Sequence, residues 1–275
     1  MPREDWLLWQ FADSALPTGG FVASSGLESA AQTGYVHDVA SLSLFVSSSI
    51  TNYAYSALPF MNDAWKVSSA NIIGEGTHEE ERLLREIMKV DDLYDACTSN
   101  TVAKRASKAQ GVAMLTLFGK SFANEDSKGG KVLDKIVEKF KFEIRRGIAC
   151  GHLPVCFGMV ASCLGISLGN LTSKIRFDFF HLIILKLIKD VFAITERAQH
   201  LFLFLFARAI LSAAVRLNII GPYYSQRMLT ESQAYVEEAL TKTKDHKSEK
   251  AVQTSPLLDI FQARHDKLYS RLFNS

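Results

Sequence analysis

The sequence of 275 residues lacks the features that would place it outside ordinary globular proteins. It has only 6 Pro and 16 Gly, which excludes collagen-like chains and Pro-rich disordered chains. Charges of the two signs nearly cancel, with 31 Lys and Arg against 29 Asp and Glu. The net charge of +2 therefore gives no reason to expect a nucleic acid or an anionic membrane as partner. Hydrophobic residues make up 48%, enough to bury a substantial core.

Signals for secretion and membrane insertion are also missing. Glu4 and Asp5 stand where a secretory signal would be basic and then apolar. The 4 cysteines form no CxxC pair, so we expect free thiols in a reducing compartment. The two most apolar stretches, 177–194 and 201–215, are interrupted by charged residues such as Lys186 and Arg208, and neither provides the roughly 20 apolar residues of a membrane span. We expect a cytoplasmic protein without a membrane segment.

Apolar residues recur at helical spacing, whereas the alternation typical of strands is scarce, so the sequence predicts an all-α fold. Two helices are expected, each with one buried face. The first comprises Leu42, Phe45, Val46, Ser49, Ile50 and Tyr53, and the second comprises Val102, Ala106, Ala109, Ala113 and Leu117. Residues 80–90 and 131–144 show the same period with more charge, as surface helices do.

Polar and Gly-rich breaks at 71–77, 124–130 and 241–254 separate these helices. The last break is rich in Lys and has almost no apolar residue to bury, so we expect a flexible linker there. The predicted organisation is one compact multi-helix domain over 1–240, the linker over 241–254, and a C-terminal tail over 255–275.

Motifs for catalysis are not found. The sequence has no Walker A loop, no GxGxxG opening a βαβ unit, no GxSxG elbow and no HExxH. Cys156 and Cys163 are seven residues apart and so share a helix face, with Cys150 and His152 nearby. A soft-metal site is one interpretation, and small apolar side chains in a core helix are the other. We predict no enzyme, no cofactor and no tight metal site.

The most unusual local sequence lies near the start. Asp13, Ser14 and the run from Pro17 through Gly19 and Gly20 have the chemistry of turns, and they interrupt an apolar helix. Ser24 or Ser25 would then cap a new helix that carries Glu28 in its first turn. This segment is either an ordinary corner between helices or a place where another backbone comes close, as in an interface or a ligand cradle.

Several blocks of the chain, taken in order, resemble the urease accessory protein UreF. They are Leu-Pro-Thr-Gly-Gly-Phe at 16–21 with Ser-Gly-Leu-Glu at 25–28, Asn100 with 105–111, Gly-His-Leu-Pro-Val-Cys-Phe-Gly at 151–158, 213–222, and the tail 264–275. Together they span nearly the whole chain, so the sequence is identified as a UreF-like protein of a eukaryotic, fungal type.

The resemblance implies an all-helical, non-enzymatic protein of urease maturation. UreF proteins dimerise, bind UreD (also called UreH) and recruit the GTPase UreG, and the assembly docks on apo-urease for nickel insertion. If nickel passes through this chain, a polar, water-filled passage suits transfer better than a tight site, and His37, His152 or the cysteines could be ligands.

The resemblance also suggests partner-binding residues. Tyr269, Arg271, Leu272 and Phe273 match the tail that the family uses to engage UreD, and aromatic and Arg anchors are typical of interface centres. The alternative is a tail packed on its own domain. Arg216, within an apolar helix, needs a carboxylate, a carbonyl or water, and Glu28 is one candidate. We expect Glu28 and Arg216, together with Pro17, Gly19 and Gly20 of the corner, to be partner-binding residues as well.

One segment departs from the family pattern. Residues 169–195 are interposed where UreF proteins have at most a short connection, and they are rich in Phe, Ile, Leu, Lys and Asn. The segment is either a retained intron translated in frame or a lineage-specific amphipathic helix.

The alternative to a urease role for the whole chain is a generic all-α interaction or regulatory protein.

Overall fold

The computed structural model describes residues 2–69, 77–123, 130–168 and 197–275. Within these ranges the chain forms helices and no strand, which confirms the all-α prediction. The first half contains α1 (Arg3–Phe11), η1 (Gly20–Val22), α2 (Leu27–Gln32), α3 (Val39–Ser56), α4 (Leu58–Ser69), α5 (Thr77–Cys97) and α6 (Thr101–Ser121). The second half contains α7 (Gly130–Arg145), α8 (Leu153–Cys163), α10 (Arg197–Arg216), α11 (Pro222–Thr243), η3 (Ser248–Lys250), α12 (Pro256–Arg264) and η4 (His265–Lys267). The breaks predicted at 71–77 and 124–130 fall almost wholly outside the described residues.

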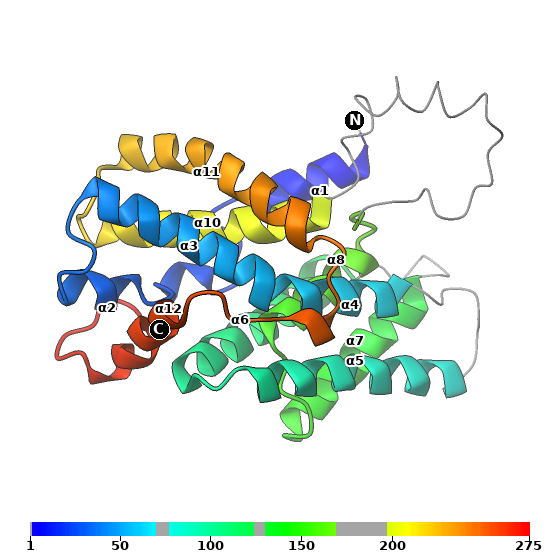
Figure 1. The fold of residues 1–275 in the computed structure, drawn as a ribbon. Helices are drawn as coiled ribbons and strands as arrows, with labels where there is room; N and C mark the ends of the chain where they lie inside the picture. The colour runs from blue at the N-terminus through cyan, green and yellow to red at the C-terminus, as the bar shows by residue number, and fades with distance from the viewer. Residues whose placement is uncertain (1, 70–76, 124–129, 169–196) are drawn as a thin grey trace.

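The helices form two groups that α3 and α4 connect (Figure 1). In the first group α3, α10 and α11 pack on one another, and in the second α8 packs on α4 and α6. Only Ala57 separates α3 from α4, so the two groups share one continuous stretch of chain. The C-terminal helix α12 returns to the N-terminal part of the fold and packs on α2 and α6.

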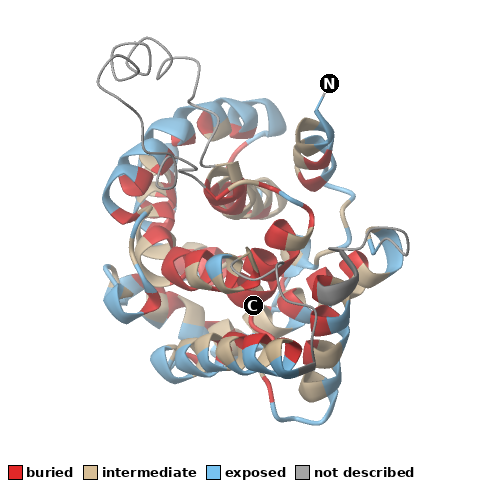
Figure 2. Ribbon diagram, turned by 90° about the vertical axis from the view of Figure 1, so that its right-hand side faces the viewer, coloured by how far each residue is buried: buried red, intermediate tan, exposed pale blue. Residues whose placement is uncertain are grey.

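Helix α8 is the centre of the second group, because every residue from Pro154 to Ser162 is buried. Two glycines allow its neighbours to approach. A Cβ atom on Gly158 would lie 2.4 Å from the carbonyl oxygen of Met61 in α4, and one on Gly111 of α6 would lie 2.1 Å from the carbonyl oxygen of Gly151. Figure 2 shows the buried residues facing one another between the helices.

The predicted stripe on α3 is confirmed. Leu42, Phe45, Val46, Ser49 and Ile50 are all buried, and Tyr53 is partly buried with its ring stacked 3.9 Å, centroid to centroid, from Phe206 of α10. The helix starts with a capping box, in which the Asp38 carboxylate accepts from the Ser41 amide at 2.8 Å.

The predicted stripe on α6 is wrong in its middle. Val102 and Leu117 are buried, but Ala109 is exposed, and the core face is instead made by Gly111, Met114 and Leu115 with their neighbours. Ala109 lies on the exposed side of α6, whereas Ala106 lines a cavity. The spacing of small alanines therefore predicted the wrong face.

Helix α10 is long and apolar enough to cross a membrane by length and composition alone. In this fold it is a core helix. It packs on α3 and α11, and its residues from Ala198 to Leu203 and from Ile210 to Ala214 are mostly buried in the protein.

The predicted linker over 241–254 makes hydrogen bonds with the domain. Helix α11 continues to Thr243, the Ser248 amide donates to Asp63 at 2.7 Å, and the Thr254 amide donates to Asn52 at 2.8 Å. The Lys244 carbonyl accepts from Asn62 at 3.0 Å. The segment therefore lies along α3 and α4, held by polar groups that its own composition could not reveal. Its flexibility stays a prediction.

The segment 169–195 lies outside the described residues, but described residues on either side of it are in contact. The Ala198 amide donates to the Ser167 carbonyl at 2.9 Å. Glu4 of α1 accepts from the Ser167 amide at 3.0 Å and lies 3.6 Å from Arg197. If Leu168 were followed directly by Glu196, the Ser167–Ala198 hydrogen bond would join residues four apart, as in an α-helical turn.

This geometry predicts that removing 169–195 leaves a folded protein. The shortened chain keeps the Ser167–Ala198 contact and loses an apolar segment, so we expect at least as much soluble protein and an unchanged or higher Tm. Soluble yield and thermal unfolding by circular dichroism measure both. A shortened chain without a cooperative transition would show that the segment is needed for folding.

The close approach at α8 predicts that Gly158→Ala destabilises the protein. The new methyl group must push α8 and α4 apart, which costs about 1–3 kcal/mol of unfolding free energy. Urea denaturation measures this loss. Gly221→Ala is the matched control, because nothing lies within 4 Å of its Cβ position. Equal stability of the two variants would contradict the packing described here.

Candidate functional site: the C-terminal tail and its cradle

The corner at 13–26 forms a turn, as its sequence predicts. Only one of its two adjacent glycines has a backbone conformation that favours glycine. Gly19 has φ +73°, a left-handed conformation that favours glycine, whereas Gly20 does not. At both positions the nearest atom to an added Cβ belongs to Gln110, at an ordinary 3.8 Å. Pro17 is exposed. The backbone of another element does not approach closely at Gly19 or Gly20.

The close approach occurs instead at Gly26, which precedes α2 with φ +86°. A Cβ there would lie 3.0 Å from the Gln262 amide nitrogen of α12. The prediction that Ser24 or Ser25 caps this helix is wrong, because α2 has no side-chain cap. Ser24 binds the end of the chain, and its amide and hydroxyl donate to the Ser275 oxygen at 2.7 and 2.9 Å.

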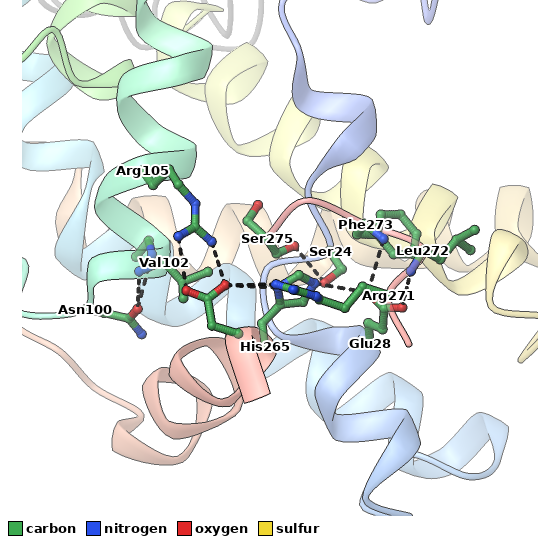
Figure 3. Close-up of polar contacts among 12 residues, drawn as sticks. Ser24, Glu28, Asn100, Val102, Arg105, His265, Arg271, Leu272, Phe273 and Ser275 are labelled. Carbon is green, nitrogen blue, oxygen red and sulfur yellow. Dashed lines mark hydrogen bonds and ion pairs between the residues drawn. The ribbon is translucent and has the colours of Figure 1, made fainter. Parts of the chain in front are cut away.

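Glu28, in the first turn of α2, holds the tail (Figure 3). Its carboxylate accepts hydrogen bonds from the Leu272 amide at 2.6 Å, the Phe273 amide at 3.2 Å and the His265 ring at 3.1 Å. Glu28 and His265 are both almost fully buried. A buried carboxylate needs such donors, so this contact fixes the path of the tail.

Arg216, at the C-terminal end of α10, lies between two aromatic rings. Its guanidinium is 3.7 Å from the ring centroid of Phe21 and 4.1 Å from that of Phe273, and it donates to the Phe21 carbonyl. The predicted partner Glu28 is occupied by the tail instead. Partial burial lowers the pKa of Arg216, and stacking on both rings compensates part of the lost hydration.

Two residues of α6 also fix the tail. Asn100 caps α6 through its side-chain oxygen, and its amide nitrogen donates to Asp259 of α12. Arg105 forms two hydrogen bonds with Asp266, at 2.7 and 3.0 Å. These bonds lower the pKa of Asp266. We call the surface that holds the tail the cradle, made by Ser24, Glu28, Asn100, Arg105 and Arg216.

The tail residues predicted to bind a partner divide into two kinds. Phe273 is only 3% exposed and packs in the cradle, and Arg271 lies 3.3 Å from Asp266 on the same tail. Tyr269 is fully exposed and Leu272 is 59% exposed. The backbone of the tail is therefore held by the domain while two large side chains point into solvent.

A cavity of about 530 Å³ lies between the corner, α3, α6, α10 and the tail. Leu258, Asp259 and Gln262 of α12 line it on the tail side. Hydroxyl and amide side chains alternate on its wall with aromatic rings, among them Ser49, Asn52, Ser107, Gln110, Tyr53, Phe157, Phe202 and Phe206.

The cysteines do not form one site. Cys156 is fully buried in α8, as the core interpretation predicts, and Cys97 on α5 is exposed. His37 is exposed at the start of α3. Cys150 and His152 lie in the loop before α8, next to Asp95 of α5.

Sequence reasoning missed Ser24, Asn100 and Arg105 as partners of the tail, and His265 as the tail residue that contacts Glu28. All four lie within or beside the blocks that resemble UreF, and that is the signal that could have found them. Periodicity could not, because Glu28 and Leu272 are 244 residues apart.

Comparisons with known proteins identify the family of the chain. A family model described as UreF matches residues 36–174 and 193–233. The chain is 32% identical, over 99% of its length and 98% of the relative's, to urease accessory protein 6 of Cryptococcus neoformans var. grubii. It is 32% identical to urease accessory protein F of Arabidopsis thaliana, with coverage of 98% and 92%, and 31% identical to that of Oryza sativa subsp. indica, with coverage of 98% and 84%. The chain belongs to the UreF family of urease accessory proteins.

The contacts of Glu28 predict that Glu28→Gln loosens the tail. One carboxylate oxygen becomes an NH₂ group that faces N–H donors, which costs about 1–3 kcal/mol. We expect faster hydrogen exchange at the Leu272 and Phe273 amides and faster digestion of the tail by carboxypeptidase. Glu238→Gln, which changes an exposed ion pair on α11, is the control. Unchanged protection of the tail would contradict the assigned role of Glu28.

Proposed function

We propose that this protein is a non-enzymatic scaffold of urease maturation, which binds UreD (UreH) and the GTPase UreG and brings them to apo-urease for nickel insertion. Membership of the UreF family and relatives named urease accessory proteins support this role. The proposal includes a homodimer that acts in the cytoplasm. The protein itself catalyses no step and holds no cofactor; it positions the proteins that do.

The exposed side of the tail is the observation that carries the proposal. Tyr269 and Leu272 are exposed, and Phe21 and Val22 of the corner are exposed close to where the Asn274 amide donates to the Val22 carbonyl. Large apolar side chains that remain exposed on an ordered backbone mark an interaction site. Because the backbone is already held, a partner gains contacts here without first ordering the chain.

The cavity beside the tail supports a role in routing nickel. Its hydroxyl and amide groups suit a water-filled passage, and in the part of the chain that the structure describes it has Asp259 as its one lining carboxylate. Arg208 and Arg216 also line it, and their charge disfavours a resident cation. A passage rather than a tight site is what transfer requires.

The proposal predicts that the double variant Tyr269→Ala, Leu272→Ala loses UreD while the domain stays folded. Both side chains are exposed, so the Tm changes little, whereas truncation of interface anchors costs about 2 kcal/mol or more each. A pull-down with UreD, and urease activity in a strain whose own UreF is deleted, measure the two effects.

Phe142→Ala is the matched control, because Phe142 is an exposed aromatic residue on α7, a helix that packs on α5, α6 and α8. Full UreD binding by the double variant would count against the tail as an interface. Full binding together with no activation of urease by the wild-type chain would favour a generic interaction protein.

A further inference from the structure

Three side chains with different ligand atoms converge where α5 passes the loop before α8. The Asp95 Oδ1 atom lies 3.0 Å from His152 Nε2 and 3.4 Å from Cys150 Sγ. All three ligand atoms lie within 4.8 Å of one another. A carboxylate, an imidazole and a thiol at such separations can reach one ion of ordinary size, since metal–ligand distances are about 2.0–2.3 Å.

The loop that carries two of these ligands is fixed by a neighbouring carboxylate. Asp91, one helical turn before Asp95, is fully buried and accepts hydrogen bonds from the amides of Cys150, Gly151 and His152, each at 2.8 Å. Gly151 has φ +74°, which turns the chain between the two ligands. The ring of Tyr94 lies 4.8 Å, centroid to centroid, from that of His152. The three ligands are therefore held in place before any ion arrives.

Charge around Asp95 is balanced by two lysines. Lys104 and Lys108 of α6 donate to its two oxygens at 2.7 and 2.9 Å. Burial alone would raise the pKa of Asp95, but the hydrogen bonds from these lysines, His152 and Cys150 lower it well below its ordinary value. Burial lowers the pKa of His152. The lysine side chains are 27% and 38% exposed, so they can turn into solvent.

We propose that Asp95, Cys150 and His152 form a site for one divalent metal ion of intermediate softness, which under the proposed function is Ni²⁺. The Cys150 thiolate, the His152 Nε2 atom and one Asp95 oxygen are the protein ligands, and water completes the coordination. Mixed sulfur, nitrogen and oxygen ligands suit Ni²⁺, Co²⁺ and Zn²⁺ rather than Mg²⁺ or Ca²⁺. The inference rests on the proposed function only for the identity of the ion.

Binding changes the protons and the charges in a defined way. The Cys150 thiol loses its proton to solvent, the proton of His152 moves from Nε2 to Nδ1, and Lys104 and Lys108 leave Asp95 while keeping their charge. The Nδ1 atom is buried without a hydrogen-bond partner in the described part of the chain. An unpaired N–H and two nearby ammonium groups both weaken the site. A weak site can release its ion, as transfer requires.

The location connects the site to the cavity. Tyr94 lines the cavity and also packs against His152, so one aromatic side chain contacts both the cavity and the site. Ser107 of α6 likewise lines the cavity, and its hydroxyl accepts from the Leu153 amide at 3.1 Å, next to His152.

Titration of the reduced, full-length protein with Co²⁺ tests the site, because a thiolate ligand gives a charge-transfer band in the near ultraviolet. We expect this band, and Ni²⁺ binding by calorimetry at one ion per chain. Cys150→Ser should remove the band and weaken Ni²⁺ binding by about tenfold or more. The matched controls Cys97→Ser and Cys163→Ser should leave both unchanged.

A second variant tests the competition by lysine without removing a ligand. Lys104→Met with Lys108→Met should tighten Ni²⁺ binding, because the ion no longer displaces two cations from Asp95. Absence of the band in wild-type protein, an unchanged band in Cys150→Ser, or weaker binding without the lysines would each overturn the proposal. UreD binding by Cys150→Ser should be normal, so a failure of the UreD experiment above is distinguishable from a failure of this one.

Discussion

The close contact of α8 with α4 and α6 is the constraint on which the rest of the structure depends. An apolar helix that is buried on all sides can be covered only if neighbouring backbones come near, and here they do so at Gly158 and Gly111. Those contacts fix α4 and α6 against α8 and the loop before it. Asn100 caps α6 and Arg105 lies in its first turns, so the position of the tail depends on how α6 packs against α8.

At two places in the fold a buried carboxylate accepts hydrogen bonds from the backbone amides of an irregular segment. Asp91 accepts three backbone amides of the loop before α8, and Glu28 accepts two amides and one imidazole of the tail. In both cases an irregular segment has backbone donors that no helix can satisfy, and an acid on a nearby helix supplies the acceptor. The segments that lack regular structure are therefore among the most strongly specified.

Sequence reasoning predicted the helices well and the long-range polar contacts poorly. The stripe from Leu42 to Ile50 is fixed by local spacing, which is why it could be predicted from the sequence and was confirmed. Ala109 was assigned to the core wrongly, because alanine occurs on core and solvent-facing sides of helices alike and its spacing does not identify the buried side. Asp91 and Asp95 lie on a helix rich in charge, where acids look like surface residues. Only the fold shows that one is buried and the other faces a thiol and an imidazole.

The burial of Glu28 has a consequence for any protein that lifts the tail away. Removal of the tail would take three hydrogen-bond donors from a carboxylate that is 1% exposed. Such a charge is not tolerated without donors, so either water must enter or the incoming protein must offer N–H groups of its own. A protein that displaces the tail therefore loses less free energy if its own backbone or side chains donate hydrogen bonds to Glu28 in place of the tail.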